Sequence, residues 1–167
     1  MCGAEVKPLP ENVQRVADLL QGKGHPHAPL MLDDACRTAQ QAADTLGVAV
    51  GQIAKSIIFK RRADQVAVLV ITSGDRRVDE KKVDVLVGKT GRADAEFVRA
   101  STGFAIGGVS PVGHLNRPVT LIDRELFRFD EIWAAAGHPH AVFRLRPHDL
   151  EGLTDGAPVA DVVQAPA

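Results

Sequence analysis

The sequence predicts a single domain, residues 1–167, of the α/β (α+β) class, with a mixed and mostly antiparallel β-sheet flanked by helices. Three observations predict this fold class. A chain of 167 residues can bury a core in one domain without disulfides or metal. Its apolar periodicity switches repeatedly between the helical and the strand pattern. The strand-like runs do not alternate strictly with helices, so a doubly wound parallel sheet fits less well.

Two helical patterns precede the first long strand. The first is closed by glycines at 22 and 24, and its apolar stripe is formed by Val13, Val16, Leu19 and Leu20. The second, "TAQQAADTLG", follows the capping-box pattern, with Thr38 as the expected N-cap, Gln41 three residues on, and Gly47 as its end. Both helices are expected to flank the sheet.

The rest of the chain supplies the strands. The runs "KSIIF" at 55–59 and "VAVLVIT" at 66–72 are joined by a short charged connection, which predicts a hairpin. Short helices are expected at 77–88 and 94–103. Three further apolar runs are expected to complete the sheet, at 104–108, 118–123 and 141–145. The tail after Leu153 is expected to be loosely held.

Charge and composition exclude several classes of protein. The formal net charge of −1 argues against a protein that coats nucleic acid, because such binding is built from many phosphate contacts. No apolar stretch approaches the roughly 20 residues of a membrane helix, and the N-terminus lacks the apolar run of a signal peptide. Cys2 and Cys36 give no metal spacing and no sign of an oxidising compartment. A cytoplasmic location without membrane contact is therefore expected.

The most informative stretch is "TGFAIGGVSPVGH", residues 102–114. Its glycines let backbone N–H groups approach a ligand closely, and such groups can hold a carboxylate, a carbonyl or a developing oxyanion. Pro111 would hold the loop in one shape. The spacing is neither that of a P-loop nor that of a dinucleotide fingerprint. From these residues alone, a tight connection of structural purpose is the favoured interpretation.

Lys55 raises a similar choice between function and structure. It shares a strand face with Ile57 and Phe59, because side chains two apart on a strand point the same way. If that face is buried, an ammonium group lies at the edge of a core. Taken alone, Lys55 is best interpreted as a lysine whose stem packs on the sheet while its ammonium reaches water.

Several separated motifs occur together in one order. The strand "IAKSIIF" is preceded by "AADTLGV" and followed by "STGFAIGGVSPVGH" and "LIDRELFRFDEIWAAAGHPHAVFRL". This combination resembles the YbaK/prolyl-tRNA editing family, the stand-alone relatives of the editing domain inserted in bacterial prolyl-tRNA synthetases. The resemblance runs from about Ala35 to Leu150, which is most of the chain. It implies the editing-domain fold and an aminoacyl-tRNA deacylase, which hydrolyses the ester joining a wrong amino acid to tRNA.

The resemblance also implies roles for individual residues. Lys55 matches the strand lysine that is thought to hold the 3′-terminal adenosine of a mischarged tRNA. Gly107 to Pro111 matches a Gly-x-x-x-Pro loop whose amides would hold the aminoacyl group, so Lys55, Gly107 and Gly108 are the candidate catalytic residues. Family members need no metal, and no cofactor is expected. The candidate substrate-binding residues are Ser110, Pro111, Gly113, His114 and, on a looser match, His138.

The chemistry of the substrate is consistent with these assignments. An aminoacyl ester is already activated, so hydrolysis can proceed by positioning a water and stabilising the oxyanion. This would explain a sequence without a convincing Ser-His-Asp or Cys-His arrangement. Lys55 then fits as a point charge for the terminal phosphate or ribose region.

The remaining polar residues favour structural interpretations. "HPH" occurs at 25–27 and 138–140, but no cysteine or carboxylate stands at ligand spacing, so a zinc site is not expected. Asp33 and Asp34 precede a helix and are expected to act in capping, and Cys36 in packing. With Trp133 as the only tryptophan and no tyrosine, a stacking platform for single strands is not expected. Surface loops are the favoured places for His25, His27, His140 and His148.

Two function classes remain open at this point. The first is an enzyme that clears mischarged tRNA in trans, binding the acceptor end while prolyl-tRNA synthetase or an elongation factor carries most other tRNA contacts. The second is a non-catalytic binding module of the same fold, which recognises an aminoacyl-like ligand or a protein partner. Residues 134–143, "AAAGHPHAVF", depart from the cysteine-clearing branch of the family, so alanine or another small residue on tRNA(Pro) is the expected substrate. Oligomeric state is not predicted.

Overall fold

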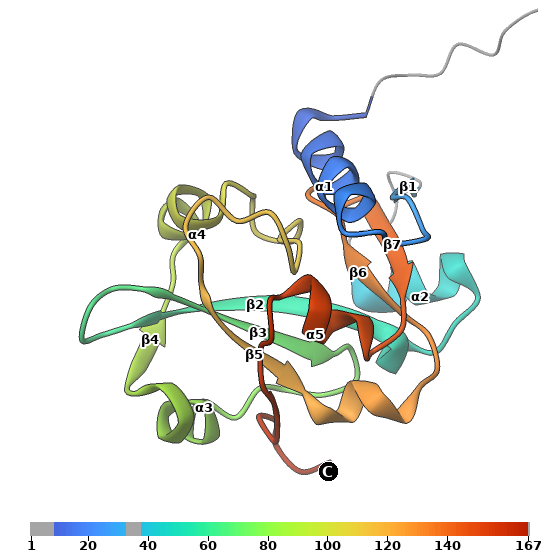
Figure 1. Cartoon of the computed structure of the whole chain (residues 1–167). Helices are drawn as coiled ribbons and strands as arrows, with labels where there is room; N and C mark the ends of the chain where they lie inside the picture. The colour runs from blue at the N-terminus through green and yellow to red at the C-terminus, as the bar shows by residue number, and fades with distance from the viewer. Residues whose placement is uncertain (1–8, 33–37, 167) are drawn as a thin grey trace, which may run out of the picture.

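The computed structural model describes residues 9–32 and 38–166, and it contains an eight-stranded mixed sheet. Seven strands lie in the order β1-β7-β6-β2-β3-β5-β8, and β4 pairs with β2 (Figure 1). The strands are β1 (Leu30–Met31), β2 (Ile53–Arg61), β3 (Ala67–Ser73), β4 (Thr90–Arg92), β5 (Val119–Asp123), β6 (Ile132–Ala135), β7 (Ala141–Leu145) and β8 (Val159–Ala160). The helices are α1 (Glu11–Gly22), α2 (Ala39–Leu46), α3 (Glu80–Val87), α4 (Ala95–Thr102) and α5 (Asp149–Leu153), with short 3₁₀ turns η1 (Val50–Gln52) and η2 (Arg124–Arg128).

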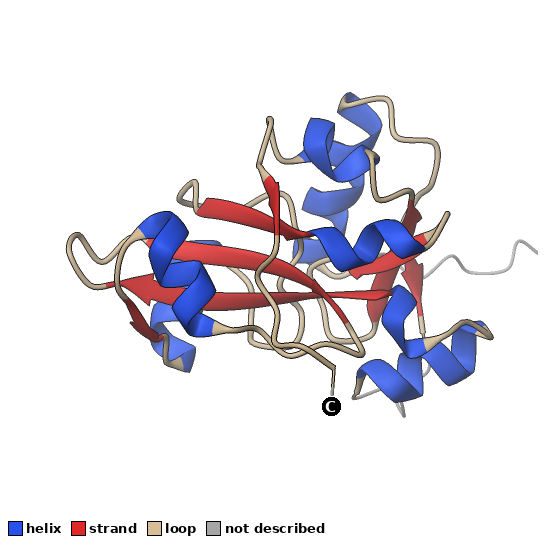
Figure 2. Ribbon diagram, turned by 90° about the horizontal axis from the view of Figure 1, so that it is seen from below, coloured by secondary structure: helices blue, strands red, loops and turns tan. Residues whose placement is uncertain are grey.

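Strand pairing confirms the predicted fold class. The pairs β1–β7, β2–β3, β2–β4 and β6–β7 are antiparallel, whereas β2–β6, β3–β5 and β5–β8 are parallel. The predicted hairpin is the β2–β3 pair, in which Lys55 lies opposite Thr72. Helices lie on both faces of the sheet (Figure 2). Within the described ranges, no helix is long and apolar enough to cross a membrane.

The local signals in the sequence specify the helix ends. Thr38 accepts a hydrogen bond from the Gln41 amide, and the Gln41 side chain accepts one from the Thr38 amide, so the predicted capping box is confirmed. Gly47 and Gly103 end α2 and α4 in the left-handed conformation, which glycine adopts at little cost. In α1 the predicted apolar stripe is buried at Val13, Val16 and Leu20.

Two predictions about the chain were wrong. Residues 104–108 form no strand, because the chain turns there with the Gly108 amide bonded to the Ala105 carbonyl at 3.0 Å. The tail after Leu153 is not loosely held: β8 pairs with β5, and Val162 and Val163 are buried. Packing against the sheet therefore anchors the tail, which its local sequence does not indicate. Asp33, Asp34, Cys36 and Cys2 lie outside the described residues.

Two hydrophobic clusters fill the two faces of the sheet. On β3, Leu69 and Ile71 belong to the larger cluster, and Val68 and Val70 belong to the smaller one. The larger cluster receives α1, α4 and α5 together with the loop between α4 and β5, and the smaller one receives α3 and the C-terminal residues. Because Val109 and Val112 belong to the larger cluster, the loop that carries the candidate site residues is anchored in the larger core.

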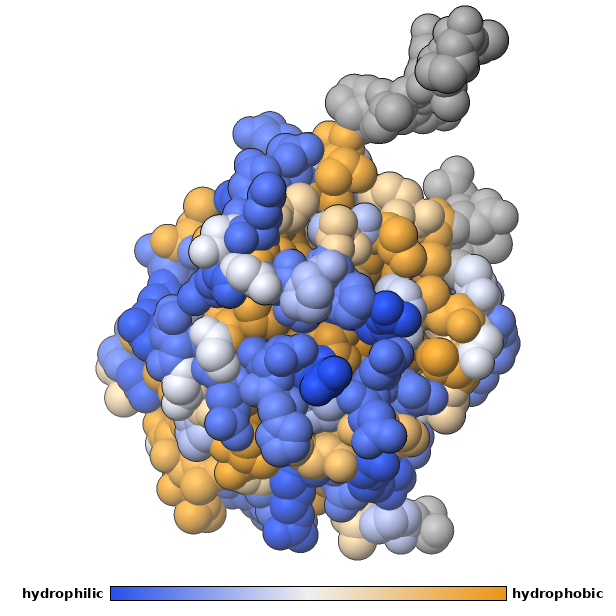
Figure 3. Space-filling model, turned by 45° about the vertical axis from the view of Figure 1, so that its right-hand side comes forward, coloured by the Kyte–Doolittle hydropathy of each residue, from blue (hydrophilic) through white to orange (hydrophobic). Residues whose placement is uncertain are grey.

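The space-filling view shows hydrophilic residues over much of one face, with apolar areas between them (Figure 3).

Candidate functional site

One cavity is lined by two of the three predicted catalytic residues, Lys55 and Gly107, whereas Gly108 does not line it. It has a volume of 290 Å³ and lies between β2, β6 and β7, helix α2, and the loop between α4 and β5. Lys55 lines it from β2 and Gly107 from the loop. Most of its wall is apolar, with Ile57, Val109, Trp133 and Val142 among the contributing side chains. The structure thus brings together two sequence signals that lie about fifty positions apart.

Lys55 is half-buried at this cavity. Its Nζ donates a hydrogen bond to the Arg76 carbonyl at 3.2 Å. Burial lowers the pKa of Lys55 below its ordinary value, because the charged form loses solvation. The Asp75 carboxylate acts in the opposite direction, and Arg77 adds to the lowering. Among the described residues the ammonium uses one of its three donors, so the other two could be taken up by a ligand.

The chain segment that holds the Lys55 ammonium is fixed by an ionic network. Arg128 Nη2 lies 2.9 Å from Asp75 Oδ1, and the Arg128 guanidinium stacks on Phe129 with 4.8 Å to the ring centroid. Burial alone would raise the pKa of Asp75, but hydrogen bonds from Arg128 and Ser73 outweigh it, so the pKa lies below its ordinary value. Asp75 therefore remains ionised at neutral pH and orders the turn that carries the Arg76 carbonyl.

Gly107 and Gly108 of the loop differ in exposure, in packing and in the hydrogen bonds of their amides. Gly107 is exposed and has φ +90°, a conformation that L side chains rarely adopt. Gly108 is buried, and a Cβ there would lie 2.9 Å from the His138 backbone. The Gly108 amide is engaged with Ala105, whereas the amides of Gly107 and Val109 have no hydrogen-bond partner among the described residues. Gly107 and Val109 are therefore the loop residues whose amides could face a ligand in the cavity.

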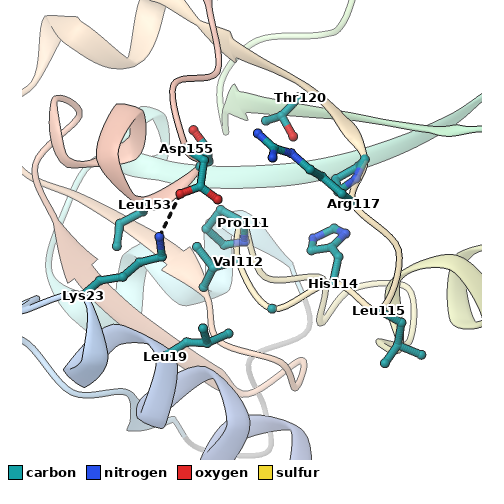
Figure 4. Close-up of a pocket in the computed structure, with 13 residues that line it drawn as sticks. Leu19, Lys23, Pro111, Val112, His114, Leu115, Arg117, Thr120, Leu153 and Asp155 are labelled. Atoms are coloured by element: carbon teal, nitrogen blue, oxygen red, sulfur yellow. Dashed lines mark hydrogen bonds and ion pairs between the residues drawn. The ribbon is translucent and has the colours of Figure 1, made fainter.

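The later residues of the loop lie at a different hollow. Pro111, Gly113 and His114 line a cavity of 390 Å³ on the side of α1 and α5, where Lys23 Nζ lies 3.0 Å from Asp155 Oδ1 (Figure 4). The buried Ser110 lines neither cavity: its Oγ accepts from the Val112 amide at 3.1 Å. The structure does not bring these four predicted substrate-binding residues to the cavity of Lys55.

His114 fixes the shape of the loop. Its Nε2 lies 2.6 Å from the Ser110 carbonyl, so Nε2 carries the proton and donates. Its ring packs edge-on against Phe104, with centroids 5.6 Å apart. Burial lowers the pKa of His114, and the Arg15 guanidinium lowers it further, although the Ser110 carbonyl acts in the opposite direction. The residue is therefore a neutral, structural element of the loop in this conformation.

His138 lies behind the cavity. Its Nδ1 accepts a hydrogen bond from the His140 amide at 3.1 Å, and its backbone packs on Gly108. The next residue, Pro139, lines the cavity, whereas His138 does not. His25 binds the Arg144 carbonyl at 2.8 Å, and His148 packs on Phe127. No three histidine, cysteine, aspartate or glutamate side chains of the described chain are grouped to hold a metal ion.

Sequence reasoning missed most of the cavity wall. Trp133 and Ala135 reach it because β6 alternates buried and half-buried residues along its four positions. The run "IWAA" carried a strand signal but is short, and β6 was not predicted. Asp75 and Arg128 were missed because their pairing joins residues 53 positions apart. The "SGD" turn after β3 was the one local signal for Asp75.

Comparisons with known proteins agree with the fold and the motifs. The family model described as "aminoacyl-tRNA editing domain" matches residues 33–153. The uncharacterized protein YwhH of Bacillus subtilis (strain 168) is 37% identical over 114 residues, which are 68% of this chain and 72% of YwhH. EbsC of Enterococcus faecalis (strain ATCC 700802 / V583), described as a candidate Cys-tRNA(Pro)/Cys-tRNA(Cys) deacylase, is 28% identical over 121 residues, 71% of this chain and 73% of EbsC.

A synthetase and a solved structure extend the comparison. The proline–tRNA ligase of Thermoanaerobacter sp. (strain X514) is 30% identical over 94 residues, which are 54% of this chain and 16% of the ligase. A crystal structure described as a candidate trans-editing enzyme for prolyl-tRNA synthetase superimposes with a TM-score of 0.88 and 40% identity, covering 95% of this chain and all of that one. These matches confirm the resemblance seen in the sequence. The chain therefore belongs to the aminoacyl-tRNA editing domain family, the YbaK-like aminoacyl-tRNA deacylases related to the editing domain of prolyl-tRNA synthetase.

Proposed function

We propose that this protein is a trans-acting aminoacyl-tRNA deacylase that hydrolyses the ester of tRNA(Pro) carrying a small wrong amino acid such as alanine. The observation that carries the proposal is the shared cavity. Lys55, Gly107 and Val109 line one small, mainly apolar space, and the amides of the latter two have no hydrogen-bond partner within residues 9–32 and 38–166. A cation and backbone donors beside an apolar pocket suit a ligand with a phosphate, an ester carbonyl and a small side chain.

Each part of the site has a role in ester hydrolysis. Lys55 binds the phosphate or ribose of the terminal adenosine, with its ammonium held by the Arg76 carbonyl. The amides of Gly107 and Val109 stabilise the oxyanion that forms when water attacks the ester carbonyl, and such donors are worth about 100-fold or more in rate. A positioned water replaces a protein nucleophile because the ester is already activated.

The cavity wall favours small, uncharged side chains. Ile57, Trp133 and Val142 offer no charge or hydrogen-bond acceptor to a polar side chain, and the volume is limited to 290 Å³. In an apolar pocket, one methylene group changes the binding free energy of a substrate by only about 1–3 kcal/mol. The protein is therefore expected to hydrolyse more than one small amino acid from tRNA. Prolyl-tRNA synthetase or an elongation factor would supply the tRNA contacts beyond the acceptor end.

The test is hydrolysis of tRNA(Pro) charged in turn with alanine, cysteine, serine and proline, with and without a chelator. We expect chelator-resistant release of alanine and little release of proline. Lys55→Ala should lower the rate at least about 100-fold with the fold intact, and the matched control Lys81→Ala, an exposed lysine on α3, should leave it unchanged. Release at the wild-type rate by Lys55→Ala would refute the role of the lysine. If no charged species is hydrolysed, either another tRNA is the substrate or the protein is the non-catalytic binding module, and binding of uncharged and charged tRNA decides between the two.

A further inference from the structure

The sheet has a gap along one edge of β2. The edge that faces β3 is paired along residues 54–60. The opposite edge pairs with β6 only at Ile53 and Ala54, and with β4 only from Phe59 to Arg61. β4 and β6 therefore lie at opposite ends of β2 (Figure 1). Residues 55–58 between them, a stretch of about 13 Å at a rise of about 3.3 Å per residue, have no strand partner on this edge among the described residues.

The direction of the backbone groups in the gap follows from hydrogen bonds at its end. The Arg61 amide donates to Val66 on the β3 side, and the Arg62 amide donates to Lys89 on the β4 side, each at 2.9 Å. Because successive residues of a strand direct their N–H and C=O to opposite edges, odd-numbered residues of β2 face β3 and even-numbered residues face the gap. The N–H and C=O of Ser56 therefore point into the gap.

The gap opens onto the candidate site. Lys55, Ser56 and Ile57 line the cavity from β2, and Trp133 and Ala135 line it from β6, which pairs with β2 at one end of the gap. Unpaired backbone groups inside a protein cost free energy unless water or a ligand binds them. The Ser56 hydroxyl is buried and has no hydrogen-bond partner in the part of the chain that the structure describes. The Ser56 N–H and C=O are thus a donor and an acceptor directed at whatever fills the cavity.

We propose that the aminoacyl group of the substrate binds in this gap as a one-residue strand, paired with the backbone of Ser56. The inference rests on the proposed function and adds how the reacting group is oriented. An aminoacyl ester has an α-ammonium donor and a carbonyl acceptor on adjacent carbons, as a strand residue has its N–H and C=O. The ester carbonyl accepts from the Ser56 N–H, and the α-ammonium donates to the Ser56 C=O. The side chain of the bound amino acid then points toward a face of the sheet, where contacts with the apolar cavity wall discriminate between amino acids.

This pairing complements the loop amides and does not replace them. A carbonyl oxygen has two lone pairs, so it can accept from Ser56 on one side and from Gly107 or Val109 on the other. The Lys55 side chain lies on the strand face opposite that of Ser56, and its own backbone pairs with Thr72. The ammonium of Lys55 is therefore directed to the nucleotide, and the α-ammonium of the amino acid is received by an uncharged carbonyl.

The decisive comparison uses two substitutions at one position, assayed on alanyl-tRNA(Pro). Ser56→Ala keeps both backbone groups and removes only a hydroxyl that has no partner among the described residues, so its rate should stay within about threefold of wild type. Ser56→Pro removes the N–H at an edge where proline displaces no strand hydrogen bond, so it should fold and lose at least about 100-fold in rate. Ser101→Ala, on α4 away from the cavity, is the matched control and should leave the rate unchanged.

A second measurement needs no substitution. Amide hydrogen exchange is followed by NMR with and without 3′-deoxy-3′-(alanylamino)adenosine, in which a stable amide replaces the ester. Binding should slow exchange at Ser56 at least tenfold and leave Lys55 and Ile57, which already pair with β3, unchanged. Unchanged exchange at Ser56 with the analogue bound would overturn the pairing, as would a fully active Ser56→Pro or an equal loss in Ser56→Ala. Hydrolysis by wild type in those cases would leave the proposed function standing, whereas its absence would overturn both.

Discussion

Gly108→Ala tests whether close packing of two loops forms the site. The added Cβ would lie 2.9 Å from both the carbonyl carbon and the Cα of His138, and 3.0 Å from the Pro139 nitrogen. Ordinary van der Waals contact begins near 3.4 Å, so the two segments must separate by several tenths of an ångström. The obstacles are backbone atoms and cannot rotate away as a side chain would. We expect overpacking to destabilise the protein by about 1–3 kcal/mol.

The expected effect is measurable by thermal unfolding. For a chain of this size, 1 kcal/mol corresponds to about 2–4 °C, so Tm should fall by roughly 2–12 °C. Gly22→Ala is the matched control, because a Cβ at this helical position meets nothing within 4 Å and should stabilise by about 0.4–1 kcal/mol. Deacylation should fall together with Tm in Gly108→Ala, since separation of the loops moves the amides of the neighbouring Gly107 and Val109. A Gly108→Ala protein as stable as wild type would refute the packing argument.

Three further predictions concern the polar network, the buried histidine and the C-terminal tail. Burial depresses the pKa of His114, so the neutral ring should contribute fully to the free energy of unfolding above the ordinary histidine pKa of 6.5, and this contribution should fall as pH drops toward the lowered pKa. In urea unfolding between pH 7.5 and 5, His114→Asn should therefore lose less stability than the wild type does. Arg128→Ala removes the partner of the partly exposed Asp75 and should cost about 1 kcal/mol in urea unfolding, with a lower deacylation rate because the turn holding Lys55 loosens. Val162→Ala should cost about 2–3 kcal/mol in the same assay, since Val162 is fully buried, and an unchanged midpoint would show that the tail is dispensable.

Resemblance and residue pattern predicted different parts of this protein. The motifs from Lys55 to the 102–114 loop identified the family, and the comparisons confirmed it. The strand and helix patterns predicted the β2–β3 hairpin and the caps of α2 and α4, because periodicity and capping act over three or four neighbouring residues. The same local signals failed at residues 104–108, where turn geometry prevailed over an apolar run.

Tertiary structure alone decided how the loop residues are divided between two cavities. Gly107 and Val109 line the cavity of Lys55, whereas Pro111 to His114 line the cavity beside α1 and α5, and the buried Ser110 lines neither. It also decided that β6 and β4 leave a gap beside Ser56, and that the C-terminal residues return to β5. These features are contacts between distant segments, and their energies come from packing and strand pairing that no local stretch of sequence contains. The sequence by itself determined the family and the local elements, and only the folded chain determined which donors, acceptors and apolar walls face the same space.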